Sequence, residues 1–194
     1  MRNTKYFKGK NITIVGLARS GVSCANLLHG LGSCVRVTDI KDNAKTRAYA
    51  ASLSSKDILV ELGLHSESFI KQADLVVISP GVLPDAQPVL WAREFGKPVY
   101  AEIEIASMLC PAEIIAVTGS NGKTTVTTLI GRILEESGRK IFVCGNIGKA
   151  FSAEVEKMQE GDFVALEVSS FQLEQIRDFK PKIAKSEQSV KETQ

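Results

Sequence analysis

The stretch that decides the fold of this chain is Thr118-Gly119-Ser120-Asn121-Gly122-Lys123-Thr124-Thr125. It follows an apolar run at 114–117 and precedes a helix-like segment at 126–136. A strand, a glycine loop and a helix in this order are typical of a phosphate-binding loop. The glycines bring backbone N–H groups close to phosphate oxygens, and the helix start adds the positive end of its dipole. The stretch therefore predicts a site for a nucleoside triphosphate.

Two side chains of this loop have chemical roles in that interpretation. Lys123 supplies a mobile cation for the outer phosphates, and Thr124 supplies a hydroxyl for Mg²⁺. The match to the usual pattern is partial, because Val117 occupies the position of its first glycine. A turn without chemical meaning is the alternative, but it does not explain why the turn lies between a buried-type strand and a helix.

Glu167 ends a second apolar run, at 163–166. A parallel strand here puts the carboxylate at the carboxyl edge of the sheet, where ligands bind. Taken alone, Glu167 is an ordinary strand-end acid that faces water. Together with the glycine loop it is a candidate Mg²⁺ ligand.

Strand-like and helix-like segments alternate along the chain, which indicates an α/β architecture with parallel sheets. Strands are expected at 11–16, 34–39, 58–61, 74–78, 97–101, 113–118, 140–144 and 163–168, and helices near 20–30, 43–53, 85–95, 102–110, 122–137, 147–160 and 171–177. Glycine turns at Gly16 and Gly119 each begin a new strand-turn-helix unit, and one open sheet rarely carries two. We therefore expect two domains, 1–101 and 102–184, and a disordered polar tail at 185–194.

The first unit carries a variant of the dinucleotide-binding fingerprint, 16–21, with Ala18 in the second glycine position. Asp39 follows 23 residues after Gly16. Such an acid holds a ribose hydroxyl or another polar edge of a nucleotide. The motif does not distinguish a dinucleotide from a nucleotide sugar, and a tight turn that binds nothing also fits it.

A further turn, Ser79-Pro80-Gly81-Val82, ends another buried strand. Its backbone is expected beside the first glycine loop, at the carboxyl edge of the same sheet. A ligand across that edge touches both loops. A Pro-Gly turn chosen only for its geometry is the alternative.

The composition is ordinary for a soluble globular protein, with 44% hydrophobic and 24% charged residues among 194. The net charge is +2, the pI is about 8.3, and lysines and arginines are scattered. No nucleic-acid partner is indicated.

The cysteines at 24, 34, 110 and 144 include no Cys-x-x-Cys pair and have no nearby histidines to complete a zinc site, so we expect reduced thiols. No apolar run reaches the roughly 18 residues that span a bilayer, and no signal peptide is recognisable. We expect a cytoplasmic monomer.

The chain resembles the amino-terminal part of the Mur ligases, and among them the member that adds D-glutamate. The resemblance runs from about Gly9 to Ala184 and rests on five motifs: Gly-Leu-Ala-Arg-Ser-Gly at 16, Ser-Pro-Gly-Val at 79, Thr-Gly-Ser-Asn-Gly-Lys-Thr-Thr at 118, Gly-Asn-Ile-Gly at 145 and Glu-Val-Ser-Ser-Phe-Gln-Leu-Glu at 167. It implies a Rossmann-like UDP-binding domain followed by an incomplete P-loop-type parallel-sheet ATPase domain.

The resemblance also implies ATP-dependent amide-bond formation. Family members transfer the γ-phosphoryl group of ATP to the carboxylate of UDP-N-acetylmuramoyl-L-alanine, and the amine of D-glutamate attacks the acyl phosphate. The resemblance implies catalytic roles for Lys123, Asn146 and Glu167, and Mg²⁺ binding by Thr124 and Glu167. It also implies that the ATP phosphates are bound by Gly119, Ser120, Asn121, Gly122, Lys123, Thr124 and Thr125.

The substrate-binding residues implied by the resemblance come from both domains. They are Arg19 and Ser20 at the diphosphate, Asp39 and Lys41 near the uracil, Ser79, Pro80 and Gly81 in the loop that closes over it, Asn146 at the muramoyl end, and Ser169.

The pattern of the family changes after Ala184. Relatives continue with the rest of the strand, an Asn-x-x-x-Asp-His motif, a carbamylated lysine and a carboxyl-terminal domain for ADP and D-glutamate, whereas this chain continues with the polar segment 185–194. His29 and His65 are far in sequence from the glycine loop, and we expect them to be surface or packing residues. We therefore expect a truncated ligase that is inactive by itself.

Two other classes of function stay open at this point. A nicotinamide-dependent dehydrogenase uses the 16–21 fingerprint and Asp39 but has no need of the Gly-Lys-Thr loop or Glu167. A nucleotide-sugar-binding module without catalysis fits the polar tail better than an active ligase does.

Overall fold

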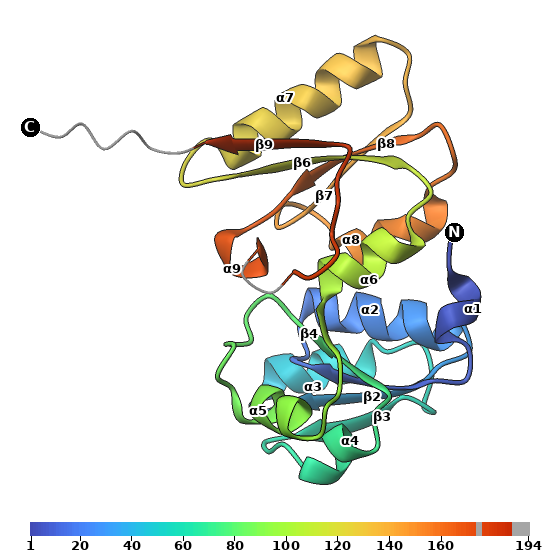
Figure 1. Ribbon diagram of the computed structural model, residues 1–194, viewed down its shortest axis with the longest axis vertical. Helices are drawn as coiled ribbons and strands as arrows, with labels where there is room; N and C mark the ends of the chain where they lie inside the picture. Colours follow the sequence, from blue (N-terminus) through green and yellow to red (C-terminus); the bar gives the residue numbers. More distant parts are fainter. Residues whose placement is uncertain (174–175, 188–194) are drawn as a thin grey trace, which may run out of the picture.

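The computed structural model describes residues 1–173 and 176–187 of the chain (Figure 1). It contains two separate parallel sheets, one built from the first half of the chain and one from the second. This confirms the predicted α/β class. All eight predicted strands are present, with bounds that differ from the prediction by two residues or fewer.

The first sheet has five parallel strands in the order β3-β2-β1-β4-β5. Its central strands are almost fully buried, as expected for strands covered on both faces. The bounds are β1 Asn11–Val15, β2 Cys34–Asp39, β3 Leu59–Leu62, β4 Leu75–Ile78 and β5 Val99–Ala101.

The second sheet has four parallel strands in the order β7-β8-β6-β9. Its bounds are β6 Glu113–Gly119, β7 Ile141–Gly145, β8 Phe163–Glu167 and β9 Ile183–Glu187. In the register, both Val117 on β6 and Gly145 on β7 lie opposite Glu167 on β8. The carboxyl ends of the three strands therefore meet at one edge.

Helices connect and cover the strands. Their bounds are α1 Thr4–Phe7, α2 Arg19–Gly30, α3 Ala44–Ala51, α4 Glu67–Lys71, α5 Gln87–Glu94, α6 Glu102–Leu109, α7 Lys123–Glu136, α8 Phe151–Glu154 and α9 Ser170–Leu173, with a 3-10 turn at Val155–Lys157. The short helices α1 and α4 have no counterpart in the sequence prediction.

Three predicted segments differ from the structure. The helix expected over 171–177 is described only as α9, which ends at Leu173; residues 176–177 are not helical, and 174–175 lie outside the described residues. The helix expected over 147–160 is reduced to α8 and the 3-10 turn, because Gly148 has a φ of +63°, which a right-handed helix excludes. Residues 185–187, expected to belong to a disordered polar tail, instead continue strand β9 to Glu187. Backbone pairing with β6 satisfies the peptide groups on that side of β9, the edge strand of the described sheet, whatever its side chains are. The rest of the predicted tail, 188–194, lies outside the described residues.

A helical layer joins the two sheets. Figure 1 shows α2, α6 and α8 between them, with α7 on the opposite face of the second sheet. One continuous apolar core crosses this layer and includes Ile14, Leu28, Ile105, Phe151 and Leu166, all fully buried. The packing therefore fixes how the two carboxyl edges face each other.

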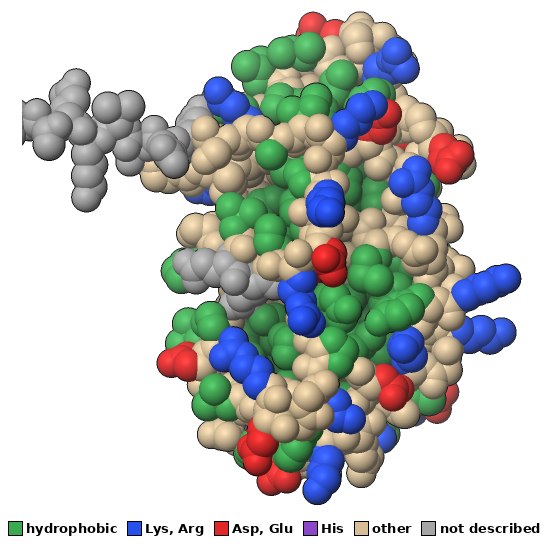
Figure 2. Space-filling view, in the orientation of Figure 1, with side chains coloured by type: hydrophobic (Ala, Val, Ile, Leu, Met, Phe, Trp, Pro, Cys, Tyr) green, Lys and Arg blue, Asp and Glu red, His purple; other side chains and the backbone are tan. Residues whose placement is uncertain are grey.

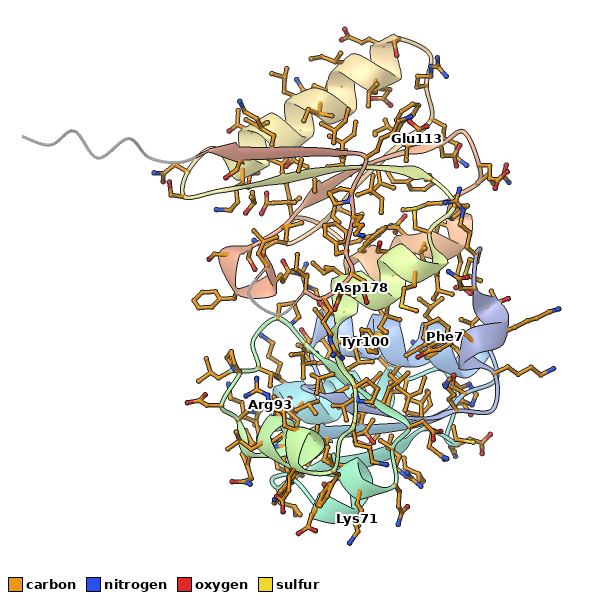
Figure 3. All side chains as sticks on the ribbon, in the orientation of Figure 1. Phe7, Lys71, Arg93, Tyr100, Glu113 and Asp178 are labelled. Carbon is orange, nitrogen blue, oxygen red and sulfur yellow. The ribbon has the colours of Figure 1, made fainter. Side chains whose placement is uncertain are left out.

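Chain segments far apart in sequence also meet in this layer. The carboxylate of Glu104 on α6 accepts the backbone N–H groups of Arg177 and Asp178, at 2.6 and 2.7 Å (Asp178 is labelled in Figure 3). Figure 3 also shows Phe7 of α1, which is fully buried beside α2. These contacts tie both ends of the described chain to the central layer.

The surface carries mixed charge on the face drawn in Figure 2, where lysine and arginine side chains alternate with acidic ones. Within residues 1–173 and 176–187, no helix has the length and apolar character that a membrane crossing requires.

Candidate functional site

The glycine loop lies between β6 and α7, as the sequence predicts. Gly119 has a φ of +145° and Gly122 a φ of +72°, so both positions need the conformational freedom of glycine. The ammonium group of Lys123 donates to the carbonyl oxygens of Gly119 and Ser120, at 2.7 and 3.4 Å. The cation therefore lies over the loop that it is expected to serve.

The carboxylate of Glu167 accepts hydrogen bonds from two residues that are far from it in sequence, Thr124 and Asn146. Thr124 Oγ1 donates to Glu167 Oε2 at 2.8 Å, and Asn146 Nδ2 donates to Glu167 Oε1 at 2.9 Å. Glu167 is only 3% exposed. A buried carboxylate that accepts one hydrogen bond on each oxygen has a fixed orientation.

Gly145 explains why Asn146 reaches this carboxylate. Its φ is +107°, and a Cβ atom at this position would lie 2.3 Å from the carbonyl oxygen of Glu167. Only glycine lets β7 turn away so close to β8. The backbone N–H of Asn146 then donates to the same carbonyl oxygen at 2.9 Å, which directs its side chain toward the Glu167 carboxylate.

The donor set fits Mg²⁺ held together with phosphate. A hydroxyl and a carboxylate are hard oxygen ligands, and protein Mg²⁺ sites commonly use one or two carboxylates plus substrate phosphates and water. No group of three or more His, Cys, Asp or Glu side chains in the described part of the chain is arranged to hold a metal ion. A Mg²⁺ ion held by Thr124 and Glu167 would take its remaining ligands from phosphate groups and water.

A first cavity, of about 360 Å³, lies at the carboxyl edge of the first sheet. Asp39 organises its floor: Oδ2 accepts the backbone N–H of Leu17 at 2.7 Å, and Oδ1 accepts that of Lys41 at 2.8 Å. The wall is mostly apolar, with Leu17, Ile40 and Leu83 among its lining residues. A cavity of this kind suits a flat, partly polar group such as a nucleobase.

The turn after β4 is tied to the loop after β1, as expected from the sequence. Ser79 Oγ donates to the carbonyl oxygen of Gly16 at 2.8 Å. Gly21 packs against the same carbonyl group, because a Cβ atom on Gly21 would lie 2.1 Å from the oxygen. The third glycine of the fingerprint therefore serves close packing of α2 on the turn.

A second cavity, of about 290 Å³, adjoins the first and is lined by both halves of the chain. Its lining residues are Ala18, Arg19, Ser20, Lys45, Tyr49, Ser79, Pro80, Gly81, Gly145, Asn146 and Gln172. Two of these are cations, which favours an anionic group such as a diphosphate. Arg19 also donates to the carbonyl oxygen of Gly148 at 2.7 Å, so it bridges the two halves.

Eight of the predicted site residues line the two cavities: Arg19, Ser20, Asp39, Lys41, Ser79, Pro80, Gly81 and Asn146. The glycine loop connects to the second cavity through the contacts of Thr124 and Asn146 with Glu167. Ser169 is connected to the second cavity through Gln172. Its backbone N–H and hydroxyl both contact Gln172 Oε1, and Gln172 lines the cavity. Asn121 and Thr125 are exposed at the mouth of the glycine loop. These placements leave the individual roles as proposals.

Sequence reasoning missed several lining residues. Lys45 and Tyr49 come from α3, and Gln172 comes from α9. His65, interpreted as a surface or packing residue, lies in the wall of the first cavity. The position of His65 just after β3 was the available signal, because all strands of this sheet end at the same edge.

Two models of known protein families match most of the chain. Residues 10–101 match the family described as Mur ligase MurD-like, N-terminal domain, and residues 117–185 match the Mur ligase middle domain.

Curated relatives agree. The chain is 44% identical over 177 residues to the UDP-N-acetylmuramoylalanine--D-glutamate ligase of Koribacter versatilis (strain Ellin345), which is 91% of this chain and 39% of that protein. It is 46% identical over 175 residues to the protein of the same name from Geotalea uraniireducens (strain Rf4), 90% of this chain and 39% of that protein. The chain thus spans about two fifths of the length of the relatives it matches.

Solved structures show the same fold. A murein peptide ligase from Psychrobacter arcticus 273-4 aligns with a TM-score of 0.52 at 20% identity, over 91% of this chain and 42% of that one. The UDP-N-acetylmuramate:L-alanyl-gamma-D-glutamyl-meso-diaminopimelate ligase from Neisseria meningitides aligns with a TM-score of 0.55 at 19% identity, over 91% and 59%.

Proposed function

Since this chain belongs to the Mur ligase family, we propose that it serves ATP-dependent amide-bond formation in peptidoglycan precursor synthesis, at the step that joins D-glutamate to UDP-N-acetylmuramoyl-L-alanine. The observation that carries the proposal is the contact of Thr124 and Asn146 with one buried carboxylate, Glu167, at the mouth of the glycine loop. Asn146 also lines the second cavity. A phosphate site and a substrate cavity thus share a residue.

The UDP end of the substrate is assigned to the first half of the chain. The uracil occupies the first cavity, near Asp39 and Lys41, and the turn at 79–81 closes over it. The diphosphate lies in the second cavity, beside Arg19 and Ser20. The muramoyl part then extends toward Asn146, and Ser169 supports this end through Gln172.

The phosphate chain of ATP is assigned to the glycine loop. Backbone N–H groups of 119–122 surround the phosphates, and Lys123 and Thr125 contact them from the start of α7. Thr124 and Glu167 hold Mg²⁺, which when bound supplies positive charge against the phosphate oxygens. Lys123 leaves the carbonyl groups of its own loop and moves to the outer phosphate.

The proposed reaction has two steps. A carboxylate oxygen of the alanyl group attacks the γ-phosphorus of ATP, the bond from that phosphorus to the β–γ bridging oxygen breaks, and ADP leaves. The amine of D-glutamate then attacks the acyl carbon, loses a proton and expels inorganic phosphate. Lys123 and Asn146 position the two anions that must approach each other in the first step.

For the 194-residue polypeptide by itself, we propose ligand binding without completed ligation. By the resemblance, the D-glutamate site belongs to a part of the relatives that these 194 residues do not match. Amide product together with ADP, formed by the purified polypeptide from the complete set of substrates, would contradict this part of the proposal.

Isothermal titration of the purified polypeptide tests the binding roles. UDP-N-acetylmuramoyl-L-alanine is titrated first and ATP with Mg²⁺ second, and saturable heat is expected from both. Glu167→Gln is expected to keep the first binding event and to lose the Mg²⁺ dependence of the second, whereas Glu160→Gln, an exposed control, changes neither. Absence of saturable binding for both ligands would refute the proposal.

A further inference from the structure

His65 lies in the wall of the first cavity, at the end of a short chain of polar contacts. Its Nδ1 atom is 2.8 Å from Thr38 Oγ1. Thr38 is fully buried, and its hydroxyl is also 3.1 Å from Glu61 Oε2 and 3.1 Å from the carbonyl oxygen of Leu64. Glu61 is itself held in place, because it accepts the backbone N–H of Ser66 at 2.7 Å and the Ser66 hydroxyl.

These contacts select one tautomer of the imidazole. The Thr38 hydroxyl has a single proton, and both Glu61 and Leu64 offer it an acceptor. Among residues 1–173 and 176–187, the one group beside Thr38 Oγ1 that can donate to its lone pairs is the Nδ1–H of His65. A buried hydroxyl that can both donate and accept does so, since an unused function costs free energy. The ring therefore carries its proton on Nδ1, and Nε2 is an acceptor without a partner among the described residues.

The ring is also neutral at ordinary pH. Burial lowers the pKa of His65 below its usual value, although the nearby carboxylates of Asp39 and Glu61 act in the opposite direction. Lys41, which lines the same cavity, is a further charged group on this side. A neutral imidazole with a free Nε2 presents a hydrogen-bond acceptor and no donor to a ligand in the cavity.

We propose that Nε2 of His65 accepts the N3–H of the pyrimidine ring and so selects uracil over cytosine. Uracil carries a hydrogen on N3, whereas the N3 of cytosine is an acceptor that would face the Nε2 lone pair. The apolar side chains of Leu17, Ile40 and Leu83 contact the faces of the ring and leave this edge as the point of discrimination. The inference rests on the proposed function, because it names the base-selecting residue of the same nucleotide site.

Nucleotide titrations test this role without catalysis. UDP and CDP are titrated into the whole polypeptide, and UDP is expected to bind about tenfold more tightly, since a site with an unpaired acceptor rejects a ligand that lacks the matching donor. His65→Asn keeps an acceptor or donor near Thr38 but removes the Nε2 position, and should lower the UDP/CDP ratio to near one. His65→Gln places an amide oxygen close to the position of Nε2 and should retain much of the preference. His29→Asn, on α2, is the control for loss of a histidine.

A pH series gives an independent readout. Protonation converts Nε2 into a donor, so the UDP/CDP ratio should fall as pH drops through the pKa of His65, below its usual 6.5. The ratio cancels the titration of the diphosphate, which both ligands share. His65→Asn should show no such change between pH 5 and 7.5, about the range where an imidazole titrates.

The outcomes separate the inference from the function on which it rests. Tight UDP binding with equal CDP affinity, or a preference that survives in His65→Asn, would overturn the role of His65 and leave the UDP site intact. Binding of neither nucleotide would overturn both. Thermal unfolding of each variant shows whether a lost preference reflects a lost fold.

Discussion

Replacement of Gly21 by alanine tests whether close packing at the first glycine turn builds the first cavity, the proposed uracil site. A Cβ atom on Gly21 would lie 2.1 Å from the carbonyl oxygen of Gly16 and 3.1 Å from Ser79 Oγ. The first distance is more than an ångström shorter than an ordinary contact between non-bonded atoms, at about 3.5 Å. The obstacle is backbone, so either α2 or the turn must move. Gly30 lies in the same helix with nothing within 4 Å of its Cβ position, and it provides a matched control.

The expected stability change follows from two opposed contributions. Alanine in place of glycine in a helix gains up to about 1 kcal/mol of unfolding free energy. Overpacking against a fixed neighbour costs about 1–3 kcal/mol or more. Gly21→Ala should therefore be destabilised by about 1–2 kcal/mol, which lowers the Tm by roughly 2–8 °C in a chain of this size. Gly30→Ala should be unchanged or up to about 1 kcal/mol more stable.

Thermal unfolding followed by circular dichroism measures the change in stability, and titration with UDP measures the change in binding. The carbonyl group of Gly16 also accepts the Ser79 hydroxyl, so its displacement should disturb the turn at 79–81 and weaken UDP binding. Gly30→Ala should bind UDP like the parent. If Gly21→Ala is as stable as Gly30→Ala and binds UDP equally well, the packing argument is wrong.

Two further substitutions test the second half of the site and the layer that joins the sheets. Gly145 has a φ of +107°, and a Cβ atom there would lie 2.3 Å from a Glu167 backbone oxygen, so Gly145→Ala should lose about 2–4 kcal/mol of unfolding free energy in urea. Gly148 has a φ of +63° and no contact under 4.0 Å, so Gly148→Ala should lose about 1 kcal/mol. Equal losses would contradict the clash. Burial raises the pKa of Glu102 in the folded protein above its unfolded value near 4.5. The contribution of the neutral carboxyl to the unfolding free energy is therefore fully present below that pH, and it is lost as pH rises through the folded pKa. Glu102→Gln should therefore gain unfolding free energy relative to the parent as pH rises from about 4.5, and a pH-independent difference would refute this.

The sequence was sufficient for the parts of the fold that depend on buried strands. Runs such as 75–78 and 163–166 are apolar because both faces of a parallel sheet are covered, and this pattern is visible without a structure. The meeting of Thr124 and Glu167 was also predictable, because parallel strands end at a common edge. Strand β9 was not among the predicted strands, because pairing with β6, and not its own composition, holds it.

The remaining part of the site depends on packing that no local pattern records. Lys45 and Tyr49 enter the second cavity because of how α3 lies on the first sheet, and their spacing alone does not reveal that direction. His65 has no motif around it, and its proposed role depends on the buried hydroxyl of Thr38, 27 residues away. Such residues become visible only when the hydrogen-bond partners are known.

The proposed site draws on both sheets, so it depends on how the central helical layer packs them against each other. The second cavity takes Arg19 from one sheet and Asn146 from the other, and Arg19 reaches across to Gly148 at 2.7 Å. This alignment depends on the shared core and on the buried carboxylate of Glu102, which accepts the backbone N–H of Ser152 at the start of α8 at 2.9 Å. Packed layers tolerate little continuous deformation. A shift between the sheets would therefore separate Arg19 from Asn146, and with them the proposed UDP and phosphate ends of the site.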